Sequence, residues 1–192
     1  MIQPFAIAIH GGAGTLVRGM MTADKERAYK EALNKAIQKG FDVLTGGGTA
    51  LDAVEQAVME LEDCPLFNAG KGSVFTAEGT HEMDASIMEG KTLKAGAVSL
   101  VTGIKNPISL ARDVMEKSGH VFLAGEGAMK FANSLNYPLE GDAYFFDQFR
   151  YDQWQELKGT PSFELDHSQK KDTKFGTVGA VACDRLGTLA AA

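Results

Sequence analysis

KFGTVGAV, residues 174–181, joins two segments of opposite character. The preceding run, GTPSFELDHSQKKDTK (159–174), is polar and rich in charge, which is typical of an exposed linker. The following residues, 177–183, are small and apolar, which is typical of a buried strand. Gly176 and Thr177 stand at the boundary between the two. We therefore expect an exposed segment that leads directly into the core of a sheet.

The N-terminal third of the chain predicts one strand and two helices. Residues 5–10 (FAIAIH) predict a short buried strand that ends in a glycine loop. After Thr22, apolar residues recur every three or four positions until the glycines at 46–48, which predicts a long amphipathic helix. Thr49 is followed by an acidic residue three positions later and predicts the start of a second helix, which ends at residues 64–65 (Cys-Pro).

The middle and the end of the chain predict more strands. Residues 82–89 alternate in hydrophobicity, so one face of this strand is expected to be buried. Residues 93–101 are small and apolar throughout, which predicts a strand covered on both faces. The other expected elements are a helix at 106–118, a strand at 121–124, a helix at 127–135, an aromatic amphipathic helix at 145–158, and paired strands in 176–184 and 187–192. This order predicts a layered α/β sandwich whose helices cover faces of a sheet.

The composition is that of one globular domain. The chain has 192 residues, of which 44% are hydrophobic and 23% charged, and its net charge of −6 is mild. No stretch rich in Lys and Arg is present, which argues against a nucleic-acid partner. Cys64 and Cys183 lie far apart and predict reduced thiols. The N-terminus lacks a basic n-region and no run approaches about 20 apolar residues, so we expect no signal peptide, no membrane partner and a cytoplasmic protein.

Thr177 allows two interpretations from its position alone. Threonine is common in strands, so the simpler interpretation is an ordinary strand residue. If the preceding peptide bond were cleaved, the freed α-amine, with a pKa near 8 when unperturbed, could take the hydroxyl proton and create a self-contained nucleophile. Such a cleavage requires an accessible polar segment before the threonine. Gly176 would tolerate the strained backbone of that step.

Three other segments carry polar residues with alternative roles. The glycine loop HGGAG fits either an anion cradle or a tight turn, and its first residue, His10, fits a general base. Residues 61–72 predict a helix end followed by an irregular glycine-rich turn, with no side-chain pattern of a metal site. His81 and Asp84 are three positions apart on an expected strand and therefore point to opposite faces. Glu82 shares a face with Asp84, and this pair fits a solvated or network role better than a catalytic one.

Six segments match a known family in the same order along the chain. They are AIAIHGGAGT (6–15), TALDAVEQAVMELEDCPLFNAGKGSVFT (49–76), HEMDASIMEGKTLKAGAVSLV (81–101), NPISLARDVM (106–115), GEGAMKFA (125–132) and FGTVGAVACD (175–184). With these segments the chain resembles the plant-type L-asparaginases, also called isoaspartyl (β-aspartyl) peptidases, among the N-terminal-nucleophile (Ntn) hydrolases. The Gly-Thr junction favours this branch over the related glycosylasparaginases and the threonine aspartase, in which Asp-Thr is the usual pair.

The resemblance implies a reaction and a set of site residues. It implies autocleavage between Gly176 and Thr177, and it implies that Thr177 is the catalytic nucleophile for hydrolysis of L-asparagine and β-aspartyl dipeptides. The amine of the threonine then takes the role of general base that the sequence alone would give to a histidine. The implied active-site loop residues are His10, Gly11, Gly12 and Asn68. The amide of the asparagine is expected to point either to the reaction centre or into its own loop.

The resemblance also implies a structural sodium ion and no organic cofactor. The ion would be held by backbone carbonyl oxygens of Leu61, Glu62, Cys64, Phe67, Ala69 and Lys71. Main-chain oxygens suit a hard cation and leave no signature in the residue types. This expectation therefore comes from the family alone.

For the fold, the resemblance implies an Ntn-hydrolase αββα four-layer sandwich. Residues 1–176 would be the α-subunit segment, with 158–176 as a flexible linker, and residues 177–192 would begin the β-subunit. The expected partners are the rest of the β-subunit, a second copy in an (αβ)2 dimer, and a small-molecule substrate. In the family, the oxyanion and substrate-binding residues come after the position that corresponds to Ala192. Two alternatives remain: a catalytically silent α/β module that binds a small molecule or anion, and a protein-directed threonine peptidase.

Overall fold

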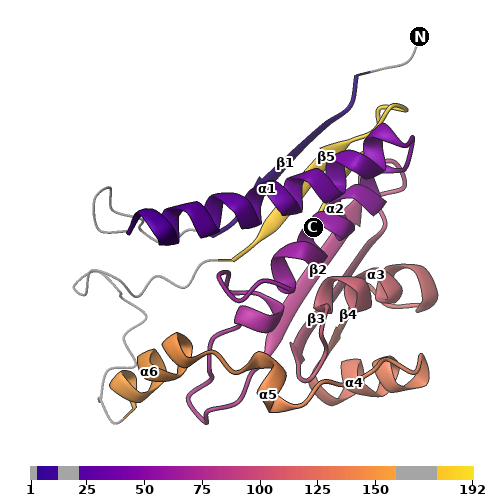
Figure 1. Ribbon diagram of the computed structural model, residues 1–192. Coiled ribbons are helices and arrows are strands. Elements are labelled where there is room, and N and C mark those ends of the chain that lie inside the picture. Colours follow the sequence, from indigo (N-terminus) through magenta and orange to yellow (C-terminus); the bar gives the residue numbers. More distant parts are fainter. Residues whose placement is uncertain (1–3, 13–21, 159–176) are drawn as a thin grey trace.

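One mixed sheet of six strands carries the helices of the molecule (Figure 1). The computed structural model describes residues 4–12, 22–158 and 177–192. The strands are β1 (Ala6–His10), β2 (Met83–Glu89), β3 (Ala95–Val101), β4 (Phe122–Ala124), β5 (Gly179–Cys183) and β6 (Leu189–Ala191), in the spatial order β1-β5-β6-β2-β3-β4. β3 and β4 are parallel, and the other neighbours are antiparallel. Strand β5, near the C-terminal end of the chain, therefore pairs with the N-terminal strand β1.

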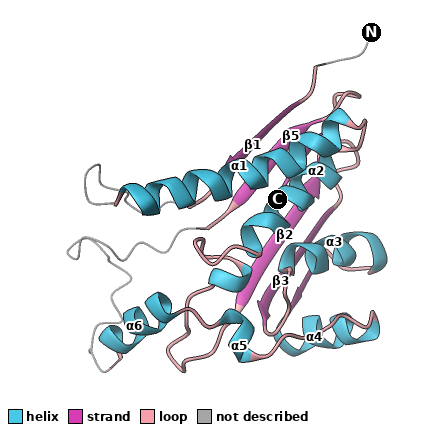
Figure 2. Cartoon of the chain, in the orientation of Figure 1, coloured by secondary structure: helices cyan, strands magenta, loops and turns pink. Residues whose placement is uncertain are grey.

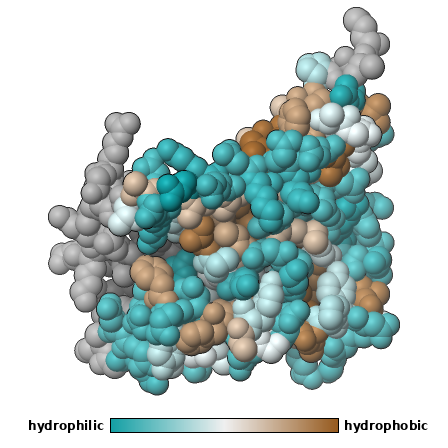
Figure 3. All heavy atoms as spheres, viewed as in Figure 1, coloured by the Kyte–Doolittle hydropathy of each residue, from teal (hydrophilic) through white to brown (hydrophobic). Residues whose placement is uncertain are grey.

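Helices pack on one face of this sheet (Figure 2). The helical elements are α1 (Ala23–Thr45), α2 (Ala50–Glu62), the 3-10 helix η1 (Gly70–Gly72), α3 (Pro107–Lys117), α4 (Gly125–Ser134), α5 (Asp142–Phe145) and α6 (Gln148–Leu157). α2 packs on β5 and β6, and α3 packs on β2 and β3. The outer surface of the helices in the same view is largely hydrophilic (Figure 3). No helix of the described residues is long and apolar enough to cross a membrane.

The two faces of the sheet differ in burial. Ile87, Val98 and Ala182 point toward the helices and are buried in the main hydrophobic core. On the opposite face, Val181 and Leu189 are 55% and 61% exposed. The expectation that the strand within 93–101 is covered on both faces is therefore wrong for the described residues, since the helices cover only one face of the sheet.

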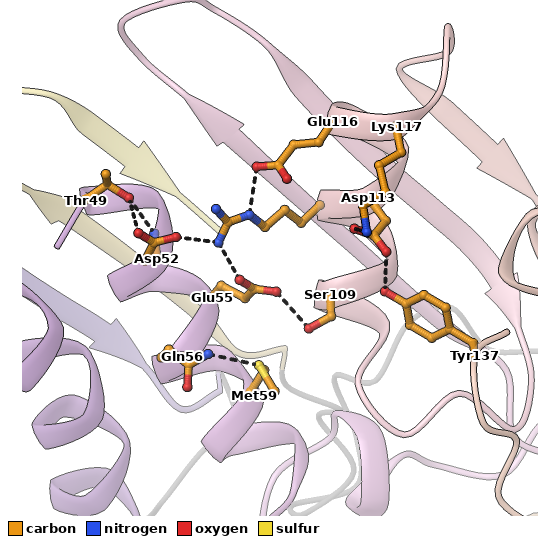
Figure 4. A network of polar contacts seen from close by, with 11 residues as sticks. Thr49, Asp52, Glu55, Gln56, Met59, Ser109, Asp113, Glu116, Lys117 and Tyr137 are labelled. Carbon is orange, nitrogen blue, oxygen red and sulfur yellow. Dashed lines mark hydrogen bonds and ion pairs between the residues drawn. The ribbon is translucent and has the colours of Figure 1, made fainter. Parts of the chain in front are cut away.

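A polar network ties α2 to α3 (Figure 4). Arg112 of α3 donates through Nη1 to Asp52 at 2.7 Å and to Glu55 at 2.6 Å, both on α2, and through Nε to Glu116 at 2.9 Å. Ser109 donates to the second oxygen of Glu55 at 2.8 Å. Because Glu55 is largely buried, this arginine neutralises a carboxylate that would otherwise be costly beside the core.

Most of the predicted elements are confirmed. The side chain of Thr49 caps α2 as expected, by accepting a backbone N–H bond three residues on, and Thr22 caps α1 in the same way. The predicted helix at 145–158 is wrong in its bounds. Helix α5 ends at Phe145, and a separate helix, α6, begins after the N-cap residue Asp147, whose side chain accepts from the N–H of Arg150 at 3.0 Å. The fold class, a mixed α/β fold with helices on a sheet, is confirmed at this level.

Candidate functional site

A cavity of about 550 Å³ opens between the loop that follows α2, strands β2 and β3, and the residues that lead into β5. Its polar lining residues are Glu62, Asn68, Ser73, Glu82, Asp84, Ser86, Ser99 and Thr177. The expected nucleophile Thr177 and the expected site residues Glu62, Asn68 and Ala69 are thus brought to one cavity from distant parts of the sequence. We take this cavity as the candidate functional site because polar groups from several segments converge on it.

Thr177 lies at the entrance to β5, two residues before the strand begins at Gly179, and its side chain is exposed. Its hydroxyl makes one contact with the described residues, a long 3.4 Å bond to the carbonyl of Val178. A bond of that length constrains the hydroxyl little, so it can turn toward the cavity. Gly176 and the charged run at 159–174 lie outside the described residues.

Asn68 is fixed by its loop and lines the cavity at the same time. Its Oδ1 accepts from the backbone N–H of Val74 at 3.1 Å, which gives the side chain a loop-structuring role. Nδ2 makes no hydrogen bond to the described residues, and Asn68 is one of the residues that line the cavity. The two roles that the sequence left open are therefore compatible in one side chain.

The glycine loop after β1 runs beside the start of β5. His10 pairs with Gly179 across the sheet, is exposed, and does not line the cavity. At Gly11 a Cβ atom would lie 2.8 Å from Leu33 Cδ2, and Gly12 has φ +123°. Both positions therefore favour glycine, because the backbone turns tightly there. Residues 13–21 of this loop lie outside the described residues.

The loop between α2 and η1 presents backbone carbonyls rather than ligating side chains. The carbonyls of Leu61, Cys64, Phe67 and Ala69 each accept a backbone N–H, at 3.2, 3.5, 3.0 and 3.0 Å. A carbonyl oxygen has two lone pairs, so such a bond leaves room for a cation. A Cβ at Gly72 would lie 2.1 Å from the oxygen of Phe67, so the loop is wound too tightly for a larger residue.

This donor set fits a hard cation such as sodium, because neutral main-chain oxygens are the ligands that such ions accept. Within the described ranges, no group of three or more His, Cys, Asp or Glu side chains could hold a metal ion. The remaining expected ligands, Glu62 and Lys71, belong to the same loop region. The backbone of Glu62 packs against Gly70.

Glu62 also has a side-chain role that the sequence did not indicate. It is 3% exposed, and its Oε1 accepts from the N–H of Ile108 at 3.0 Å while Oε2 accepts from Asn106 at 3.2 Å. Burial raises the pKa of this carboxyl to about 8, against the opposing effect of the two hydrogen bonds. A glutamate at the end of a helix is ordinarily exposed, so no sequence signal could have found this contact with the N-terminus of α3.

Asp84 has the network role that the sequence favoured. Its Oδ1 accepts from the hydroxyl of Ser99 at 2.6 Å and from the N–H of Leu100 at 2.9 Å. Leu100 has φ +54°, and the aspartate stabilises this irregular position in β3. His81 is buried whereas Asp84 is exposed, so the two do not converge, as predicted.

Comparison with known proteins extends over almost the whole chain. A family model described as asparaginase matches residues 2–192. An isoaspartyl peptidase of Salmonella typhimurium is 47% identical; the match covers 97% of this chain and 60% of that relative. An isoaspartyl peptidase of Escherichia coli is 48% identical, with 97% of this chain and 59% of the relative covered. A plant-type L-asparaginase of Pyrococcus horikoshii is 51% identical, with 93% of this chain and 59% of the relative covered. The chain spans about three fifths of the length of these relatives.

Proposed function

Because the chain belongs to the asparaginase family, we propose that it is part of an amidohydrolase precursor that cleaves itself at Gly176-Thr177 and then hydrolyses L-asparagine and β-aspartyl dipeptides. The observation that carries the proposal is the position of Thr177, which is exposed and shares a cavity with Asn68. An exposed hydroxyl can act as the nucleophile that attacks a carbonyl, and an amide that lines the same cavity can hold a polar group of the substrate.

In the proposed maturation, the Thr177 hydroxyl attacks the carbonyl carbon of Gly176. The C–N bond between the two residues breaks, the acyl group moves to the threonine oxygen, and the amine of Thr177 takes the proton. Water then hydrolyses the ester, which restores the hydroxyl and leaves residue 177 as a new N-terminus. An unperturbed α-amine has a pKa near 8, so about 10–30% of it is neutral at physiological pH, and this neutral form can act as the base.

Hydrolysis then follows the same chemistry on a substrate. The hydroxyl of Thr177 adds to the side-chain carbonyl of asparagine or of a β-aspartyl dipeptide while the α-amine takes the hydroxyl proton. The same proton passes to the leaving nitrogen, which departs as ammonia or as the amine of the second amino acid. The α-amine deprotonates a water molecule, which attacks the β-aspartyl ester; the bond to Oγ of Thr177 breaks, the proton returns to that oxygen, and aspartate is released. The Nδ2 donors of Asn68 are suited to hold a polar group of the reacting centre.

The loops beside the cavity have supporting roles in this proposal. His10, Gly11 and Gly12 bring the glycine loop alongside the start of β5, through the pairing of His10 with Gly179. A sodium ion held by the carbonyls of Leu61, Glu62, Cys64, Phe67, Ala69 and Lys71 would fix the loop that carries Asn68. The ion supplies charge that organises these carbonyls, and it takes no part in the chemical steps.

The uncovered face of the sheet supports an Ntn αββα sandwich for the complete protein. Val181, Leu189 and Met88 present apolar side chains on that face, and a second sheet would bury them. In this proposal residues 1–176 form the α-subunit segment and residues 177–192 begin the β-subunit. The rest of that subunit would supply the second sheet and the oxyanion donors, and two αβ units would form the (αβ)2 dimer.

The proposal is tested with Thr177→Ala and Thr177→Ser in the full-length gene product. We expect Thr177→Ala to lose both the cleavage and the hydrolysis of L-asparagine and β-aspartyl dipeptides, and Thr177→Ser to retain part of each because it keeps a hydroxyl. Normal turnover by Thr177→Ala would refute the nucleophile. Turnover of folded proteins in preference to β-aspartyl dipeptides would instead indicate a protein-directed peptidase.

A further inference from the structure

His81 is enclosed by aromatic rings behind the wall of the cavity. It is 8% exposed, and its ring centroid lies 4.2 Å from that of Phe75 and 5.8 Å from that of Phe145. Its Nδ1 lies 3.2 Å from the hydroxyl oxygen of Ser73. Its Nε2 is buried and has no hydrogen-bond partner among the described residues. Among the described residues, Ser73 is therefore the one side chain that shares a hydrogen bond with His81, and Ser73 lines the cavity.

This environment selects one form of the ring. A proton on Nε2 would create a buried N–H donor without an acceptor among the described residues, which is more costly than a bare lone pair. The favoured tautomer therefore carries its proton on Nδ1 and donates to Ser73. Burial lowers the pKa of His81, while hydrogen bonding with the backbone at Ser73 and Val74 and the charge of Asp142 on α5 act in the opposite direction. A neutral ring at physiological pH agrees with this geometry.

The hydrogen bond of His81 reaches Asn68 through two adjacent residues. Ser73 is the partner of His81, and the next residue, Val74, donates its N–H to Oδ1 of Asn68 at 3.1 Å. The N–H of Ser73 also donates to the carbonyl of Gly70 at 3.0 Å, which closes the loop. All four loop residues line the cavity, whereas His81 does not. If Ser73 shifted, the N–H of Val74 would shift with it. The hydrogen bond from this N–H to Oδ1, which sets the plane of the Asn68 amide, would then move.

We propose that His81 is a positioning residue that holds Ser73 and Val74 in place and thereby directs the Nδ2 N–H donors of Asn68 toward Thr177. This inference rests on the proposed function, because it assigns the role through Asn68 and Thr177. Donors in a catalytic site must be held to within about 0.5 Å, and a displacement of about 1 Å can lower a rate about 100-fold. Loss of the Ser73–His81 bond is expected to act on the reaction rather than on substrate binding.

The kinetic test uses Ser73→Ala, His81→Phe, the double variant, and His81→Asn in the full-length gene product. Phenylalanine keeps the aromatic packing and loses the hydrogen bond, whereas the amide of asparagine can stand in for Nδ1. We expect the two single variants to lower kcat about 10- to 100-fold with KM changed less than about threefold, and the double variant to be no worse than the more affected single variant. His81→Asn should recover most of kcat, and His120→Phe, at an exposed histidine, should match the parent.

A readout that needs no activity separates this inference from the proposed function. The side-chain amide resonances of Asn68, measured by NMR in isotope-labelled protein, should shift in Ser73→Ala and His81→Phe and stay near their original positions in His81→Asn. Unshifted resonances, or a kcat per folded molecule equal to that of the parent in both single variants, would overturn the positioning role. If the parent itself neither cleaves nor hydrolyses, the proposed function fails, and the resonances still decide whether His81 orients Asn68.

Discussion

Asp184 accepts a hydrogen bond from the backbone N–H of Ala50 at 3.1 Å, which joins the β5–β6 hairpin to the first turn of α2. The other oxygen of the same carboxylate accepts from the N–H groups of Leu186 and Thr188, at 2.9 and 3.0 Å, within the hairpin turn. One buried carboxylate thus anchors the strand that follows Thr177 to a helix from the N-terminal part of the chain.

Replacement of this carboxylate should destabilise the fold. In Asp184→Asn the amide offers one acceptor oxygen for three N–H donors. Its NH₂ group replaces a carboxylate oxygen that accepted a hydrogen bond. We expect the free energy of unfolding to fall by about 1–3 kcal/mol, measured by urea denaturation. Asp24→Asn, at an exposed aspartate on α1, is the matched control and should change it by less than about 0.5 kcal/mol. Equal effects of the two variants would contradict the role of Asp184.

The same residue predicts a dependence of stability on pH. Burial acts to raise the pKa of Asp184, but the N–H groups of Ala50, Thr188 and Leu186 outweigh it and the pKa is lowered. A lowered folded-state pKa means that its stabilisation is complete above the unfolded value of about 3.9 and is lost as the pH falls through the folded value. Unfolding curves measured below about pH 4 should therefore show a smaller loss of stability on acidification in Asp184→Asn than in the parent.

Arg112 should be more important for stability than a surface ion pair. It contacts three carboxylates, and Glu55 would be left largely buried and unpaired in Arg112→Ala. We expect the free energy of unfolding to fall by about 2–3 kcal/mol. The control is Lys30→Ala, which breaks an exposed pair with Glu26 and should cost less than about 0.5 kcal/mol. A cost for Arg112→Ala as small as that of the control would show that the network does not hold α2 against α3.

Gly72→Ala should disturb the loop proposed to bind sodium. The added Cβ would lie 2.1 Å from the carbonyl oxygen of Phe67, so the backbone must move, at a cost of about 1–3 kcal/mol. We expect sodium to raise the Tm of the full-length parent and to have a much smaller effect on the variant. Gly127→Ala, where a Cβ meets nothing within 4 Å, should keep the sodium effect. Stoichiometric zinc or iron bound to the parent, found by elemental analysis, would contradict a sodium site.

The elements with strong local signals were predictable from the sequence. Thr22 and Thr49 cap their helices because a side-chain oxygen three residues before a free N–H is a local arrangement. The pairing of β5 with β6 followed from two apolar runs joined by a short polar turn. The break between α5 and α6 was missed because the aromatic residues around it fit one continuous amphipathic helix, and only the cap at Asp147 marks the new start.

The polar contacts of the site depend on residues far apart in sequence, and no local pattern records them. Glu62 meets the N-terminus of α3, and His81 meets Ser73, only because the chain folds back on itself. The cation site depends on carbonyl oxygens, which every residue has, so it required the family resemblance. The sequence also did not show that helices leave one face of the sheet uncovered in the described residues, because the small apolar residues of β3 fit a strand covered on both faces.

The most direct test of the account is the denatured intact mass of the full-length gene product after incubation, followed by N-terminal sequencing of any smaller fragment. The account predicts two fragments from the parent, the smaller beginning Thr-Val-Gly-Ala-Val at Thr177, and a single uncut mass from Thr177→Ala. A single parent mass that stays uncut for days would contradict it. Thr177 would then be an ordinary residue that leads into a strand, and the interpretation of the protein as a catalytically silent binding module would take precedence.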